Sequence, residues 1–162
     1  MSAKQPITGI VFDSWAILAW LQGEPAGVFV RDLIDWCDGK PGAAEGVIPL
    51  LQGGLIPPRL FLNIINLGEV FYLLGRRKGE KIARETIRRI KTTSIQIVSV
   101  SDDLVLKAAL IKMKYPVAYA GAFAVATARD KNSLLMTGNP EIKGIEEVDI
   151  FWIGRDLKEG DG

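Results

Sequence analysis

The chain has 162 residues, one Cys and no His, and its 20 basic and 19 acidic side chains give a net charge of +1. This length predicts a single domain over residues 1–162. The absence of histidine excludes a Ser-His-Asp triad and a His-ligated zinc site, so any catalysis is expected to use carboxylates or a bound metal. A cytoplasmic location is predicted, because Cys37 is alone and the N-terminus lacks a signal-peptide pattern. No membrane insertion is expected, because the apolar runs are too short to span a bilayer.

The first part of the chain predicts a strand followed by helices. Residues 7–12 (ITGIVF) are apolar and partly β-branched, which favours a strand that ends at Asp13, and helical spacing of apolar residues begins directly after it. Helical spacing returns over residues 28–37, and residues 43–52 predict a further short helix. Two prolines in residues 55–61 (LIPPRLF) lead into a brief second strand.

The remainder of the chain alternates helical and strand patterns. The predicted elements are helices over 63–76 and onward from Gly79, a strand over 94–100, helices over 101–114 and 120–130, a strand over 133–137 and an edge strand over 148–153. A flexible tail is expected over about 155–162. Strands separated by helices predict an α/β fold, a three-layer α/β/α sandwich with a central, mainly parallel sheet.

Polar residues at the carboxyl ends of the predicted strands are the first candidates for function, because ligands of such sheets bind there. Asp13 follows the first strand, and Asn139 follows the fourth in a Gly-Asn-Pro sequence. Structural alternatives stay open, since Asp13 is also suited to cap a helix and Asn139 to form a turn. Glu69 lies in a mostly apolar helix, where a buried acid needs a partner. Asn66, one helical turn earlier, either positions water or phosphate or is a polar surface residue.

Residues 76–91 (RRKGEKIARETIRRIK) form a strongly basic stretch. Eight Lys and Arg against Glu80 and Glu85 give it a local charge of +6, which leaves −5 for the rest of the chain. A basic helical ridge of this kind is suited to follow a phosphate backbone. The alternative is a solvated amphipathic helix, with three isoleucines facing the core and two arginines facing water: Ile82, Ile87, Ile90, Arg84 and Arg88.

Several segments occur in a specific order along nearly the whole chain. They are VFDSWAILAWLQGEP, NLGEVFYLLGRR, AALIKMKYPVAYAGAFAVATA and LLMTGNPEIK, followed by FWI near the end. As an ordered set they resemble the PIN-domain nucleases, in particular the VapC-type toxins of prokaryotic toxin-antitoxin pairs. The resemblance implies a PIN-like fold, hydrolysis of RNA with Mg²⁺ or Mn²⁺ held by four acids, an antitoxin partner and a homodimer, for which the apolar helix over 28–37 is a candidate interface.

Matching the four acidic positions of the family places the first on Asp13 and the second on Glu69. The third falls on Gly121 and the fourth on Asn139, while Ala118 replaces a small polar residue that usually precedes the third acid. The resemblance therefore implies Asp13 and Glu69 as metal ligands, with Asn139 as a third catalytic residue that orients water. Two carboxylates supply −2 instead of −4, so weak or absent binding of Mg²⁺ or Mn²⁺ is expected.

Two hypotheses follow from this partial match. The first is a weakened metal-dependent endoribonuclease whose activity Asp13→Asn abolishes. The second is a PIN pseudo-nuclease that binds RNA, an antitoxin-like peptide or a second copy of itself, with free N–H groups near Gly121 donating to a phosphate. Gly121→Asp combined with Asn139→Asp is expected to create or raise cleavage. The expected RNA contacts are Asn66, Arg76, Arg77, Lys78 and Arg84.

Overall fold

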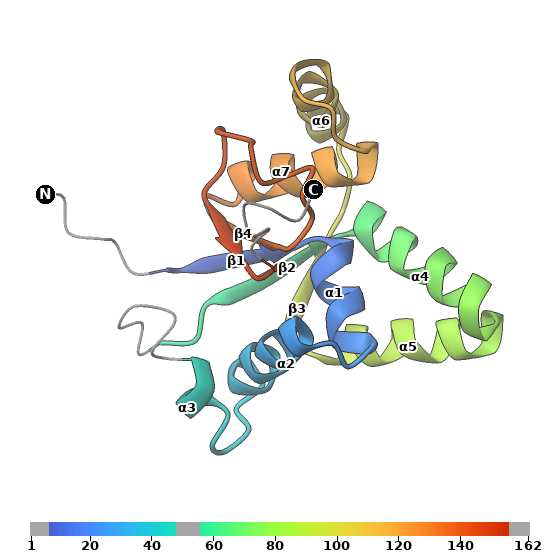
Figure 1. Cartoon of the computed structure of the whole chain (residues 1–162), viewed down its shortest axis with the longest axis vertical. Coiled ribbons are helices and arrows are strands. Elements are labelled where there is room, and N and C mark those ends of the chain that lie inside the picture. Colours follow the sequence, from blue (N-terminus) through green and yellow to red (C-terminus); the bar gives the residue numbers. More distant parts are fainter. Residues whose placement is uncertain (1–6, 48–55, 156–162) are drawn as a thin grey trace, which may run out of the picture.

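A computed structural model describes residues 7–47 and 56–155 and shows a sheet between two layers of helices (Figure 1). Within these residues, five strands lie in the order β3-β2-β1-β4-β5, and each neighbouring pair is parallel. The elements in chain order are β1 (Gly9–Phe12), α1 (Ser14–Leu21), α2 (Pro25–Cys37), α3 (Ala44–Val47), β2 (Arg59–Asn63), α4 (Ile64–Lys78), α5 (Glu80–Thr92), β3 (Ile95–Val98), α6 (Asp102–Lys114), α7 (Tyr119–Asp130), β4 (Leu134–Thr137) and β5 (Ile150–Trp152). The predicted three-layer α/β/α sandwich is confirmed.

Alternation along the strands divides the core between the two faces of the sheet. In β1, Ile10 and Phe12 pack in one cluster with side chains of α1, α2, α4 and α5, whereas Val11 packs in a second cluster with α6 and α7. Both faces are covered by helices, so β1 is apolar at every buried position, as in other parallel sheets. In α7, all residues from Gly121 to Ala128 are buried, and its several alanines allow close packing on the sheet.

The element boundaries differ from the predictions at several points. The helix predicted over 28–37 begins at Pro25, because proline is well suited to the first turn of a helix. The second strand starts only at Arg59, after the two prolines, and continues to Asn63. Of the helix predicted over 43–52, residues Ala44–Val47 are helical and the remainder lies outside the described residues, as does the tail from residue 156.

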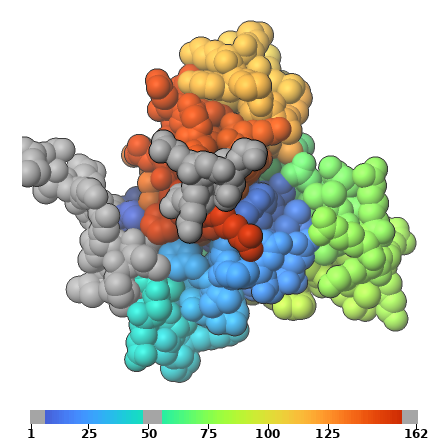
Figure 2. Space-filling view, in the orientation of Figure 1, coloured from blue at the N-terminus to red at the C-terminus, as the bar shows by residue number. Residues whose placement is uncertain are grey.

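The basic stretch forms a helical hairpin and not one ridge. It covers the last turn of α4 and the whole of α5, and Gly79 separates the two helices with a φ of 91°, a value that favours glycine. The hairpin projects from the body of the molecule beside α1 (Figures 1 and 2). Ile90 is fully buried and Ile87 half-buried, but Ile82 is 45% exposed, so the prediction that Ile82 faces the core is wrong.

The apolar side of α2 is used within the chain. Val30, Leu33 and Ile34 are buried in the core beneath α2, whereas Val28 is 44% exposed. On α6, by contrast, Leu106 and Met113 are 66% and 78% exposed. None of the described helices has the length and apolarity that crossing a membrane requires.

Candidate functional site

The candidate site lies at the carboxyl edge of the sheet, where β1 and β4 are neighbours. The chain runs from β1 towards β2 on one side and from β4 to β5 on the other, so this edge is a topological switch point of the kind that binds ligands in α/β proteins. Asp13 follows β1 directly, and Thr137 is the last residue of β4. Parallel pairing of these two strands brings the two side chains together although they are far apart in sequence.

Asp13 is buried, and both of its carboxylate oxygens accept hydrogen bonds. The N–H of Ala16 donates to Oδ1 at 2.9 Å, which caps α1, and the hydroxyl of Thr137 donates to Oδ2. The pKa of Asp13 is raised to about 6, mainly by burial and to a smaller extent by the charge of Glu69, while the hydrogen bonds from Thr137 and Ala16 lower it in part. The helix-capping role of Asp13 is therefore confirmed.

Glu69 faces the same edge of the sheet from α4. It is half-buried, and its Oε1 accepts a hydrogen bond from the hydroxyl of Ser14, the residue that follows Asp13. The structure thus brings the first two acidic positions close enough for their charges to interact. Each carboxylate is held by a hydroxyl group of this chain.

Asn66 is a buried link between α4 and α7. Its side chain is fully buried, and its Nδ2 donates to the backbone oxygen of Ala120 at 2.9 Å. Its Oδ1 is also buried, and no described residue donates to it. Asn66 is therefore neither a polar surface residue nor accessible to a nucleic acid, and it is removed from the set of expected RNA contacts.

Gly121, where the resemblance to the family places the third acid, is surrounded by apolar side chains. A Cβ added to Gly121 would lie 2.8 Å from Cγ2 of Val117 and 3.6 Å from Cδ1 of Ile142. Both neighbours are buried, and the first distance is too short for a real Cβ. A side chain at this position requires Val117 to move, so the space that an acid would need is already filled.

The fourth acidic position forms a turn. The Oδ1 of Asn139 accepts a hydrogen bond from the N–H of Glu141 at 3.0 Å, and its own N–H donates to Oγ1 of Thr137 at 3.0 Å. This agrees with the turn alternative for Asn139. Glu141 in turn accepts from the N–H of Ala118 at 3.0 Å, so a carboxylate already occupies part of the amino end of α7.

These residues do not fit a resident Mg²⁺ or Mn²⁺. No group of three or more His, Cys, Asp or Glu side chains within residues 7–47 and 56–155 is arranged to hold a metal ion. Both oxygens of Asp13 and one oxygen of Glu69 accept hydrogen bonds from the chain itself, and the amide oxygen of Asn139 does the same. Hard divalent cations are held by several oxygen ligands, and the two carboxylates of this edge are both already hydrogen-bonded within the chain.

The basic candidates lie apart from the carboxylates, on the hairpin. Arg76, Arg77 and Lys78 are exposed at the carboxyl end of α4, where positive charge is also favourable for the helix dipole. Arg84 is exposed on α5 and forms an ion pair with Glu80 at 3.2 Å.

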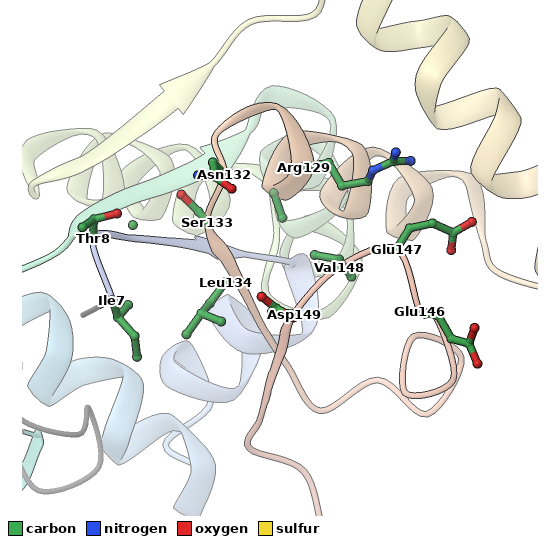
Figure 3. Close-up of a pocket in the computed structure, with 12 residues that line it drawn as sticks. Ile7, Thr8, Arg129, Asn132, Ser133, Leu134, Glu146, Glu147, Val148 and Asp149 are labelled. Atoms are coloured by element: carbon green, nitrogen blue, oxygen red, sulfur yellow. The ribbon is translucent and has the colours of Figure 1, made fainter. Parts of the chain in front are cut away.

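Sequence reasoning did not single out Ser14 and Thr137, the hydroxyl residues that bind the two acids. Their positions in the sequence could have pointed to them, since Ser14 directly follows Asp13 and Thr137 is the last residue of a strand. A cavity of about 340 Å³ lies at the opposite, amino edge of β1 and β4 (Figure 3). It is lined by Thr8, Ser133 and Asp149 among others, and is separate from the candidate site.

Comparison with known proteins agrees with this architecture. The DNA-bound VapBC of Salmonella typhimurium is similar with a TM-score of 0.64 at 10% identity, over 91% of this chain and 99% of that chain. Mycobacterium tuberculosis VapC20, a toxin that cleaves the sarcin-ricin loop, is similar with a TM-score of 0.59 at 21% identity, over 86% of this chain and 98% of that chain. A chain of a toxin-antitoxin complex from Klebsiella pneumoniae is similar with a TM-score of 0.57 at 17% identity, over 89% of this chain and 97% of that chain.

No curated protein sequence matches the chain. A family model described as the PIN domain matches residues 10–148, a range that runs from β1 to beyond β4 and includes all the acidic positions discussed above. The match covers most of the chain, and the solved structures share its fold. The chain therefore belongs to the PIN domain family.

Proposed function

We propose that this chain is a VapC-like PIN protein that binds single-stranded RNA and has lost efficient metal-dependent cleavage. The observation that carries the proposal is the combination of a carboxyl edge with only two family acids and a strongly basic hairpin beside it. Val117 lies too close for a Cβ at Gly121, so an acid at that position would require Val117 to move. The basic hairpin has no structural need for so many cations, since most are exposed.

Electrostatics supports a polyanion as the ligand of the hairpin. The local charge of +6 is concentrated on two short helices that project from the body, where several phosphates can approach at once (Figure 2). Arg76 lies over the ring of Tyr72 at 5.2 Å, which holds its guanidinium in place at the surface. Arg84 contributes less, because Glu80 already compensates its charge.

Fluorescence anisotropy with a labelled single-stranded RNA in EDTA tests this proposal. Binding is expected without metal and should weaken as salt increases. The double variant Arg76→Gln/Lys78→Gln should reduce the slope of log K against log salt by about 0.7 for each phosphate that the variant no longer neutralises. Arg31→Gln is the matched control, because this arginine lies on α2 and pairs with Asp32 at 3.0 Å. A strict requirement for Mg²⁺, or equal slopes for all proteins, contradicts the proposal.

Weak endoribonuclease activity is the alternative function, and one observation favours it. Asp13 and Glu69 lie at one edge of the sheet with interacting charges, and a metal ion there would have to replace hydrogen bonds that both carboxylates now accept. On this alternative Mg²⁺ or Mn²⁺ supports slow cleavage of single-stranded RNA, EDTA stops it, and Asp13→Asn abolishes it. Incubation of labelled RNA with wild type and Asp13→Asn, with and without Mn²⁺, decides between the two functions.

An antitoxin is the protein partner that the toxin-antitoxin relatives suggest. A groove of about 370 Å³ between α4 and α5 has an apolar floor and a basic rim, which favours an acidic amphipathic peptide. Its lining residues include Leu67, Phe71, Ile87, Arg88 and Lys91. Such a peptide would compete with RNA for the same hairpin, and competition in the anisotropy assay tests this.

For a homodimer, α6 is a better interface than α2. Leu106, Leu110 and Met113 recur on one face and are exposed. The helix begins with Asp102 and Asp103 and ends with Lys114, so two copies packed antiparallel place opposite charges together. Leu110→Glu should convert a dimer to a monomer in sedimentation velocity, whereas Ile82→Glu on α5 should not. A monomeric wild type excludes the dimer.

A further inference from the structure

A cavity of about 630 Å³ lies beside the candidate site, at the carboxyl ends of β4 and β5. Trp15, two residues after Asp13, lines it from α1, and Gly138, directly after Thr137, lines it from the end of β4. The cavity therefore adjoins the hydrogen-bonded pair of Asp13 and Thr137 at the same edge of the sheet. Its volume is in the range of pockets that hold small molecules.

We propose that this cavity is a subsite for one base of a single-stranded RNA. The inference rests on the proposed RNA binding and adds the place at which a base is bound. Two tryptophans, Trp15 and Trp152, form part of its walls, together with the cations Lys143 and Arg155. Indole rings with neighbouring cations are the combination that proteins use to bind bases of single strands without reading their sequence.

Glycines position both indole rings against the backbone. A Cβ added to Gly138 would lie 2.3 Å from Cη2 of Trp15, so the ring packs directly on the end of β4. A Cβ added to Gly154 would lie 2.6 Å from Cζ2 of Trp152 and 2.9 Å from Cα of Gly138. Larger residues at either position would displace the rings, and the two glycines therefore fix the walls of the cavity.

Charged side chains accompany the indole rings in the lining of the cavity. The ammonium group of Lys143 lies 4.8 Å from the ring centre of Trp152, and the guanidinium of Arg155 and the carboxylate of Glu24 also line the cavity. The indole Nε1 of Trp152 is buried and no described residue accepts its hydrogen. A buried indole N–H normally has an acceptor, so this donor is unsatisfied within the described residues.

The position of the cavity gives an RNA strand a continuous path. Figure 1 shows the basic hairpin of α4 and α5 beside α1, and Trp15 of α1 lines the cavity, so α1 adjoins both. A strand bound by its phosphates along the hairpin would cross the edge near Asp13 and place a base between the tryptophans. Because residue 121 is a glycine, the strand would pass only two of the acids that the family resemblance implies, Asp13 and Glu69.

The test compares short single-stranded RNA with an oligomer of the same length and charge that lacks bases. Wild type should bind the base-containing strand more tightly, and Trp15→Leu should weaken that binding about 10-fold, as expected for loss of one stacked base. Binding of the abasic strand should not change. Trp36→Phe on α2, outside the cavity, is the matched control and should leave both affinities unchanged.

A second measurement does not depend on the folding of Trp15→Leu. In a Trp20→Phe/Trp36→Phe protein the remaining indoles are the two that line the cavity, and AMP and UMP should quench their fluorescence. The subsite is overturned, and the proposed function left intact, if the protein binds RNA but AMP and UMP do not quench the fluorescence and Trp15→Leu changes the affinity for neither the base-containing nor the abasic strand. Absence of RNA binding with quenching retained refutes the proposed function alone. A cavity that accepts a side chain of a protein partner would leave RNA affinity and fluorescence unchanged, which also overturns the subsite.

Discussion

Asp13→Asn tests whether burial of this carboxyl group costs folding free energy. Its pKa rises from the ordinary 3.8 to about 6, mainly because of burial. The folded protein therefore holds the proton more tightly than the unfolded chain, and the contribution of Asp13 to stability falls as pH rises from about 4 to about 6. The difference between the two pKa values corresponds to about 3 kcal/mol at pH 7.

Asparagine has the same shape and no charge. Its oxygen can still accept from the N–H of Ala16, and its amide can donate to the hydroxyl oxygen of Thr137. We expect the unfolding free energy of Asp13→Asn at pH 7 to exceed that of wild type by up to about 3 kcal/mol, and this excess to disappear near pH 4. Urea titrations at several pH values measure it. Asp103→Asn, at an exposed carboxylate, is the control. A variant less stable than wild type at pH 7, or an excess independent of pH, refutes the reasoning.

Three further predictions concern buried residues. Gly121→Asp should lower the free energy of unfolding in urea by about 1–3 kcal/mol, because the new side chain crowds Val117. Val117→Ala in the same chain should recover part of that loss. A Gly121→Asp protein as stable as wild type would contradict the close packing of Val117 on residue 121. Asn66→Ala should cost about 1–3 kcal/mol in the same assay, since it leaves the carbonyl of Ala120 without its buried donor. Burial raises the pKa of Cys37 to about 12, so iodoacetamide at pH 8 should label the folded protein much more slowly than the urea-unfolded chain, and equal rates contradict this.

Much of the fold was predictable because the local pattern and the final environment agree. The strand at residues 9–12 is apolar throughout and buried on both faces, and Ser101 begins α6 by accepting from the N–H of Leu104. Some boundaries differ by a few residues, as where the strand after the two prolines begins only at Arg59. The break between the two helices at Gly79 was predicted, and the positive φ of this glycine accounts for it. Ile82 lies on the hairpin beyond the reach of the core, which its spacing could not indicate.

The candidate site was predictable in its identities but not in its contacts. Asp13 and Glu69 followed from the order of motifs along the chain. The bond from Thr137 to Asp13 depends on the register of β1 with β4, which pairs Phe12 with Met136, and no local pattern reports it. The enclosure of Gly121 depends on Ile142 returning over α7 from the loop after β4, a tertiary contact of the same kind.

The packing around Gly121 has a consequence for any attempt to make this edge more acidic. An acid introduced at residue 121 meets Val117 at once, so that substitution alone lowers stability. A smaller side chain at position 117 therefore has to precede or accompany the acid, and the order in which the two substitutions are made decides whether the intermediate protein is destabilised.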